Sequence, residues 1–127
     1  MSKGSIVNVS SDAGLHPIPR LASYGITKEA LHMFAKIIAV EFGEHIIRVN
    51  TVCPTSLKTP GYDTLGFIEQ QFDEMLKNQA TKLLLLRCAN ISNVVNEILF
   101  FASNSDEFLT AHILPIDQGL SLTTRAT

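Results

Sequence analysis

Residues 23–28 read SYGITK, and they open a long apolar segment. Tyr24 and Lys28 are four residues apart, so on a helix both side chains lie on one face, one turn apart. A nearby positive charge favours the deprotonated form of a phenol, which suits such a pair to general acid–base catalysis. Taken alone, the pair more often means a half-buried ring beside a solvated charge. The interpretation therefore depends on the segments around it.

A β-branched run precedes this stretch. Residues 5–10 (SIVNVS) predict a buried parallel strand. Ser11 follows directly, 13 residues before Tyr24. Ligands of open α/β sheets bind beyond the carboxyl ends of the strands, so a hydroxyl here can hold a substrate oxygen while Tyr24 moves the proton. The same Ser-Ser-Asp-x-Gly run is also typical of a plain turn.

A long helix is expected over Ser23–Phe42, with Ser23 as its N-cap and Gly43 at its end. Apolar residues recur every four positions, and others widen this stripe or lie on the remaining faces. The main row consists of Ala22, Ile26, Ala30, Phe34, Ile38 and Phe42. The pattern predicts a helix that packs on a sheet and also against a second surface. That surface belongs either to another subunit or to the same chain.

Two further strands are expected at residues 46–53 and 110–117. A polar, helix-prone segment at 62–82 lies between them, followed by a helix capped by Ser92 or Asn93. Strands that alternate with helices predict right-handed crossovers and a parallel sheet. The fold class is therefore α/β.

Composition excludes several classes of protein. The chain has 127 residues, a net charge of −2 and no basic cluster, so neither a nucleic-acid surface nor a membrane surface is expected. Two cysteines without a second pair predict no metal site and no disulfide framework. No signal peptide and no apolar run of about 18 residues is present, so a cytoplasmic protein is expected.

Three segments together resemble the C-terminal half of a short-chain dehydrogenase/reductase: residues 4–11 (GSIVNVSS), Tyr24-x-x-x-Lys28 and residues 47–55 (IRVNTVCPT). Residues 114–117 (LPID) and the Pro-Thr turn resemble the L-xylulose reductase (dicarbonyl reductase) and carbonyl reductase branch. The resemblance implies the C-terminal half of a Rossmann-like, doubly wound parallel sheet, with three strands and crossover helices. Residues 1–127 would then be a partial domain, the catalytic and substrate-binding half, without the N-terminal half.

The resemblance implies hydride transfer between NAD(P) and a carbonyl or alcohol, such as a sugar ketone or dicarbonyl. By this resemblance, Tyr24 transfers the proton. Lys28 stabilises the deprotonated form of Tyr24 and binds the nicotinamide ribose, and Ser11 orients the substrate oxygen. NADP is the expected cofactor, with NAD as the alternative. The further cofactor-binding positions implied are Pro54, Thr55, Leu57 and Thr59. Local composition alone is equally typical of a Pro/Gly turn there.

Seven glycines form no Gly-rich turn of the kind that holds a dinucleotide pyrophosphate. The chain is therefore expected to be a fragment that binds NADPH weakly or not at all, with one strand edge exposed. The resemblance implies a homo-oligomer that assembles through the Ser23–Phe42 helix. The alternative function is a truncated, non-catalytic module that associates with oligomers of the family.

Overall fold

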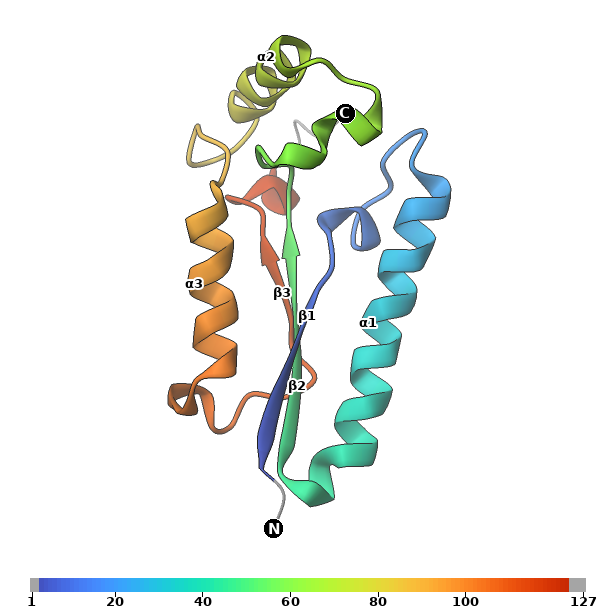
Figure 1. Cartoon of the computed structure of the whole chain (residues 1–127), viewed down its shortest axis with the longest axis vertical. Helices are drawn as coiled ribbons and strands as arrows, with labels where there is room; N and C mark the ends of the chain where they lie inside the picture. The colour runs from blue at the N-terminus through green and yellow to red at the C-terminus, as the bar shows by residue number, and fades with distance from the viewer. Residues whose placement is uncertain (1–2, 124–127) are drawn as a thin grey trace.

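Three parallel strands form the centre of the molecule: β1 (Gly4–Val9), β2 (Ile47–Pro54) and β3 (Ile113–Ile116), in the order β1-β2-β3 (Figure 1). The computed structural model describes residues 3–123, apart from the side chains at positions 64, 65 and 106. Gly4 is paired with Ile47, and Thr51 is paired with Ile113. The parallel sheet predicted from the alternation of strands and helices is confirmed.

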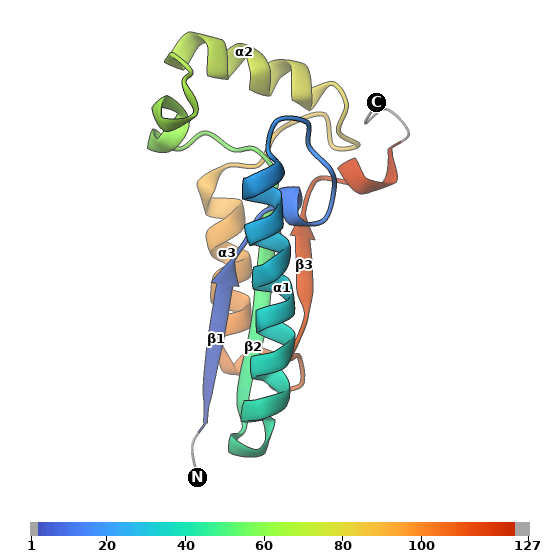
Figure 2. The ribbon, with the colours of Figure 1, turned by 90° about the vertical axis from the view of Figure 1, so that its right-hand side faces the viewer.

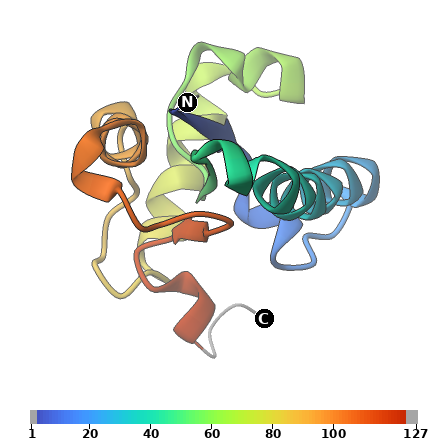
Figure 3. The same cartoon turned by 90° about the horizontal axis from the view of Figure 1, so that it is seen from below.

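Helices cover both faces of this sheet. α1 (Ala22–Phe42) lies on one face and α3 (Ile91–Ala102) on the other, as the view from below shows (Figure 3). α2 (Glu69–Ala80) lies beyond the carboxyl ends of the strands (Figures 1 and 2). The chain is therefore an α/β structure in which one end of the sheet, the carboxyl end, is covered by a separate helix.

β2 is the buried centre because its side chains alternate between two cores. Val49 packs with Ala35 and Ala39 of α1. Val52 packs with Val94 and Phe101 of α3. Every residue from Val49 to Thr55 is buried, including the polar residues Asn50, Thr51 and Thr55, because both faces of the strand are covered.

α1 faces the sheet with small residues rather than with the row of bulky residues expected from the sequence. Its buried residues are His32, Ala35 and Ala39. Ile26 is 70% exposed and Phe34 is 51% exposed. Alanine lets the helix backbone approach the strands closely, so the bulky side chains lie on the opposite side and leave an apolar surface in this chain.

The predicted N-cap of α1, Ser23, is wrong, whereas the predicted end at Phe42 and Gly43 is confirmed. The helix begins at Ala22, and Leu21 is the N-cap without a side-chain hydrogen bond, so Ser23 lies inside the first turn. Gly43 occupies the C-cap position in a right-handed conformation, and the left-handed residue of this turn is Ile46, with a φ of 58°. A short 3-10 turn, Gly43–His45, lies between them.

The predicted cap of α3 is also wrong. Asn90 is the N-cap, and its side chain accepts the N–H of Asn93 at 3.1 Å. The Asn93 side chain accepts the N–H of Asn90 at 3.0 Å in return. This reciprocal arrangement is a capping box, so Asn93 does belong to the cap, but as its third helical residue. Ser92 instead donates to the Asn90 side chain.

β1 is an edge strand within the described part of the chain. It pairs with β2 on one side only, and Ile6 and Val9 are 38% and 51% exposed. An edge strand presents a row of unpaired backbone groups on its outer side. None of the helices between residues 3 and 123 combines the length and the hydropathy that crossing a bilayer requires.

Candidate active site

The carboxyl ends of β1 and β2 bring two predicted site segments side by side. The N–H of Ser10 donates to the carbonyl of Val52 at 2.8 Å, so the ladder continues to the last residues of both strands. Ser11 follows β1, and Thr55 follows β2. Both therefore lie at the edge of the sheet where ligands of α/β proteins bind.

Two glycines allow the short 3-10 turn η1 (Asp12–Gly14) to lie directly against α1. A Cβ on Gly14 would lie 2.7 Å from the His32 ring and 2.9 Å from the backbone of α1. A Cβ on Gly25 would lie 2.7 Å from the carbonyl oxygen of Ala13. Real Cβ atoms do not approach other atoms so closely, so both positions require glycine. This contact holds the end of β1 against the first turns of the helix.

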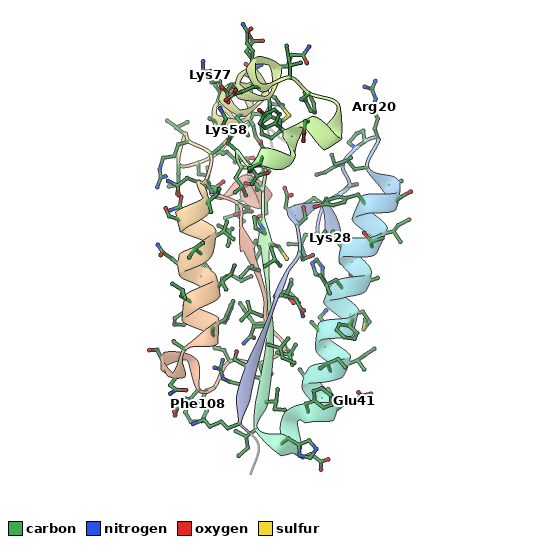
Figure 4. All side chains as sticks on the ribbon, viewed as in Figure 1. Arg20, Lys28, Glu41, Lys58, Lys77 and Phe108 are labelled. Carbon is green, nitrogen blue, oxygen red and sulfur yellow. The ribbon has the colours of Figure 1, made fainter. Side chains whose placement is uncertain are left out.

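Tyr24 and Lys28 are neighbours on those first turns. The Lys28 Nζ lies 5.4 Å from the centroid of the Tyr24 ring, within the range of a cation–π interaction. Tyr24 is 46% exposed, and Lys28 is partly buried. Figure 4 places Lys28 and Lys58 in the half of the molecule that α2 caps. The phenol therefore stands at an open surface beside the carboxyl end of the sheet.

Ser11 is buried and caps η1. Its hydroxyl donates to Asp12 Oδ1 at 3.2 Å and accepts the N–H of Ala13 at 3.2 Å. Burial raises the pKa of the Asp12 carboxyl, although the hydrogen bond from Ser11 opposes this shift. Ser11 must therefore turn its hydrogen away from Asp12 before it can donate to a substrate oxygen.

Thr55, at the end of β2, is hydrogen-bonded to residues at the end of the neighbouring strand β3. Its N–H donates to the carbonyl of Ile116 at 3.2 Å, and its hydroxyl donates to Gln118 Oε1 at 3.0 Å. Local sequence pattern does not reveal this contact, because Gln118 lies 63 residues away from Thr55. The Thr55 hydroxyl is occupied by this contact, and its side chain is buried.

The loop after Thr55 carries the remaining predicted cofactor positions. Pro54 is buried as the last residue of β2, and the Leu57 side chain packs into the core beside Val52. Thr59 is exposed and makes no side-chain capping bond. Leu57 can therefore reach a ligand only through its backbone.

The backbone of this loop is open to a ligand. Within residues 3–123, the N–H groups of Ser56, Leu57 and Thr59 have no hydrogen-bond partner. A carboxamide is recognised by donors and acceptors of this kind. These N–H groups are therefore available as hydrogen-bond donors just beyond the carboxyl end of β2.

Sequence analysis missed one residue of the site, His32. This histidine is 1% exposed, and its Nε2 lies 2.8 Å from the Oγ of Ser10. A signal was present in the sequence: His32 follows Lys28 by four residues, so it shares the helix face of Tyr24 and Lys28.

Two cavities among the described residues are lined by residues other than Ser11, Tyr24 and Lys28. One, of about 280 Å³, lies between α3 and the end of β3, and the other lies on the outer surface of α1. No cluster of three potential metal ligands occurs among the residues that the structure describes. The candidate site is thus an open face of this chain rather than an enclosed pocket.

Comparison with known proteins identifies the family. A family model described as enoyl-(acyl carrier protein) reductase matches residues 1–121. L-xylulose reductase of Cavia porcellus is 38% identical over 120 residues, which are 94% of this chain and 48% of that protein. L-xylulose reductase of Caenorhabditis elegans is 35% identical over 119 residues, 94% of this chain and 46% of that protein. The chain thus spans about half the length of the curated relatives it matches.

Solved structures give the same result. A short-chain dehydrogenase/reductase from Burkholderia thailandensis superposes with a TM-score of 0.82 at 30% identity, over 94% of this chain and 45% of that one. ElxO with bound NADP gives a TM-score of 0.76 at 31% identity, over 94% of this chain and 47% of that one. The strand order, the helices on both faces and the sequence identity agree: the chain belongs to the short-chain dehydrogenase/reductase family.

Proposed function

We propose that this chain carries the proton-transfer and nicotinamide-facing half of an NAD(P)-dependent oxidoreductase that interconverts a carbonyl and an alcohol. One observation supports this most directly. Tyr24 and Lys28 stand together on a turn of α1 that two glycines hold against the Ser11 end of β1. A phenol, an ammonium and a hydroxyl at one sheet edge form a general acid with two supporting groups.

Each side chain has a separate task in this proposal. Tyr24 donates its phenolic proton to the carbonyl oxygen, or takes it back from the alcohol in the reverse direction. Ser11 leaves Asp12, which it contacts at 3.2 Å, and donates its hydroxyl hydrogen to the same oxygen. Lys28 supplies positive charge beside the phenol and stabilises the negative charge left after the proton departs.

A bound nicotinamide would supply the hydride to the carbonyl carbon, or accept it from the alcohol carbon, while Tyr24 exchanges the proton with the oxygen on that carbon. The open backbone donors of Leu57 and Thr59 would hold its carboxamide, and Lys28 would hold its ribose. Pro54 and Thr55 would support that loop from the end of β2. NADP is the proposed cofactor, with NAD as the alternative, because the similar structure of ElxO contains NADP.

The proposed substrate class is a sugar ketone or a dicarbonyl. Two L-xylulose reductases among the relatives support it. Specificity would depend on α2 and the loop before it, since they lie over the carboxyl ends of the strands (Figure 2).

Substitution of Tyr24 tests the proposal. In a chimera, residues 4–121 of this chain replace the matching half of the Cavia porcellus reductase, and oxidation of NADPH is followed with L-xylulose and with a dicarbonyl. Tyr24→Phe should lower kcat by about 10²–10⁴-fold, because general acid catalysis contributes this much, while NADPH binding is retained. Full activity of the variant would refute the assignment.

Tyr62→Phe is the matched control, since Tyr62 is the other tyrosine of the chain. Its ring stacks on Phe72, with centroids 5.8 Å apart, so the ring contact survives the substitution. Because Tyr62 lies in the segment before α2, the KM for the substrate can change in this variant, whereas kcat should stay within about threefold, a change below 1 kcal/mol. For the 127-residue chain alone, titration followed by nicotinamide fluorescence should detect weak NADPH binding or none.

A second candidate function is association with other proteins of the same family. The exposed apolar side chains of α1 favour it, and they are Ile26, Met33, Phe34, Ile37 and Val40. Apolar surface of this kind on one helix is typical of an interface. Size-exclusion chromatography and a pull-down against a full-length relative test this function. A monodisperse monomer that captures no relative would contradict it.

A further inference from the structure

One imidazole connects the segments on which the candidate site rests. His32 Nε2 lies 2.8 Å from Ser10 Oγ and 3.2 Å from Cys53 Sγ. Its Nδ1 lies 2.8 Å from Glu29 Oε2. Gly14 of η1 packs against the same ring. His32 thus contacts the end of β1, the end of β2 and η1, and it extends from α1 itself.

The partners of His32 determine where its hydrogen lies. The Glu29 carboxylate can only accept, so Nδ1 carries the hydrogen and donates to it. Nε2 is then left to accept from the Ser10 hydroxyl at 2.8 Å. The Lys28 carbonyl is a more distant alternative for that hydroxyl, at 3.3 Å.

Cys53 adds a weak second donor at the same nitrogen. Burial raises the pKa of its thiol to about 11, so the sulfur keeps its hydrogen at neutral pH. The thiol and the Ser10 hydroxyl both point their polar atoms at Nε2. The ring is therefore hydrogen-bonded at both nitrogens although only 1% of it is exposed, as a buried polar group requires.

Each side chain that is hydrogen-bonded to the imidazole belongs to a residue next to a candidate site residue in the sequence. Ser10 precedes Ser11, Glu29 follows Lys28, and Cys53 precedes Pro54. In extended backbone, successive side chains point to opposite sides, so Ser10 faces the helix while Ser11 faces elsewhere. The contacts of His32 can therefore set the positions of the site residues without touching a substrate.

We propose that His32 is a positioning residue, which fixes the Ser11 segment, the Lys28 turn and the Pro54 loop relative to one another. This inference rests on the proposed function for its consequence in catalysis. The hydrogen-bond network itself does not depend on that function. A structural test and a kinetic test therefore address separate statements.

The structural test uses the 127-residue chain, in which the four histidines are labelled with ¹⁵N. At neutral pH, His32 should carry its hydrogen on Nδ1, although imidazole in water prefers the opposite tautomer. Ser10→Ala should move the Nε2 resonance and leave the Nδ1 hydrogen in place. The opposite tautomer, or an Nε2 resonance unchanged by Ser10→Ala, would overturn the proposal.

Two substitutions separate positioning from simple loss of stability. Glutamine places an amide near the position of Nε2 and can still meet Ser10, whereas asparagine is too short to reach it. In His32→Asn, hydrogen exchange at the amides of Gly14 and Leu15 should accelerate about tenfold relative to Ala39. His32→Gln should restore much of the protection. Equal acceleration at all three amides, or no difference between the two variants, would overturn the proposal.

The kinetic test uses the same chimera as the Tyr24 experiment. A displaced hydroxyl weakens stabilisation of the transition state more than binding of the ground state. In His32→Asn, kcat should therefore fall about tenfold or more, while the KM for NADPH, which the Lys28 turn and the Pro54 loop would contact, should rise by a smaller factor, and His32→Gln should recover activity. An unchanged kcat in His32→Asn would overturn the positioning role. An unmodified chimera without activity would instead refute the proposed function and leave the exchange test in force.

Discussion

Gly14→Ala tests the close contact that brings η1 to α1. The added methyl group would lie 2.9 Å from two backbone atoms of the helix and 2.7 Å from the buried His32 ring. Ordinary contact begins at 3.4 Å, so η1 must retreat by about 0.5 Å from the helix backbone and about 0.7 Å from the ring. Neither the helix backbone nor the ring can rotate away, because the ring is hydrogen-bonded at both nitrogens. Overpacking of this kind costs about 1–3 kcal/mol.

Thermal and urea unfolding, followed by circular dichroism, measure this cost. A loss of 1–3 kcal/mol should lower Tm by about 4–12 °C for a chain of this size. Gly43→Ala is the matched control, since nothing lies within 4 Å of a Cβ there. That control should leave stability unchanged or raise it by up to about 1 kcal/mol. If Gly14→Ala were as stable as Gly43→Ala, the proposed contact between η1 and α1 would be refuted.

Three other substitutions probe separate parts of the structure. The pKa of about 11 at Cys53, raised by burial from 9.0, means that the unfolded chain loses this proton first. Stability should therefore fall by up to about 2–3 kcal/mol between pH 9 and pH 11, and Cys53→Ala should abolish this fall in urea titrations. Lys58 contacts two carboxylates of α2 at 2.8 and 2.9 Å, and these hydrogen bonds raise its pKa. Lys58→Met should accelerate amide exchange in α2 by roughly two- to fivefold, and high salt should produce the same effect in the unmodified chain. Arg48 donates to the carbonyls of Phe101 and Ser103 at 3.0 and 2.9 Å, so Arg48→Met should cost about 1–3 kcal/mol in urea unfolding.

The sequence predicted the elements better than their ends. β2 was readable because its run is rich in β-branched residues and ends at a Pro-Thr turn. β3 is shorter than the predicted segment 110–117, because Ala111 has a left-handed φ of 60°. The side chain of Thr110 there accepts the N–H of Val49 at 3.1 Å in place of a ladder bond. This side-chain hydrogen bond joins residues that are 61 positions apart, so the local sequence pattern does not reveal it.

The same limit applies to the candidate site. The spacing of Tyr24 and Lys28 is a local property of a helix, so it could be read directly. The burial of His32 depends on Ser10 and Cys53, which are 22 and 21 residues away in sequence. Periodicity identified only part of the buried face of α1: Ala35, Ala39 and Ile38 pack on the sheet, but His32 was missed and Ile26, Phe34 and Phe42 point outward.

Ser10 and Ser11 are adjacent and identical, but their hydroxyl groups make different contacts. The Ser10 hydroxyl bonds to the His32 imidazole of α1, and the Ser11 hydroxyl caps η1 at the carboxyl edge of the sheet, where ligands of α/β proteins bind. Saturation mutagenesis of this chain should therefore show that both serines are sensitive to substitution, but that different replacements are tolerated at each of them. In such an experiment, sensitivity to mutation would not measure distance from the reacting carbon.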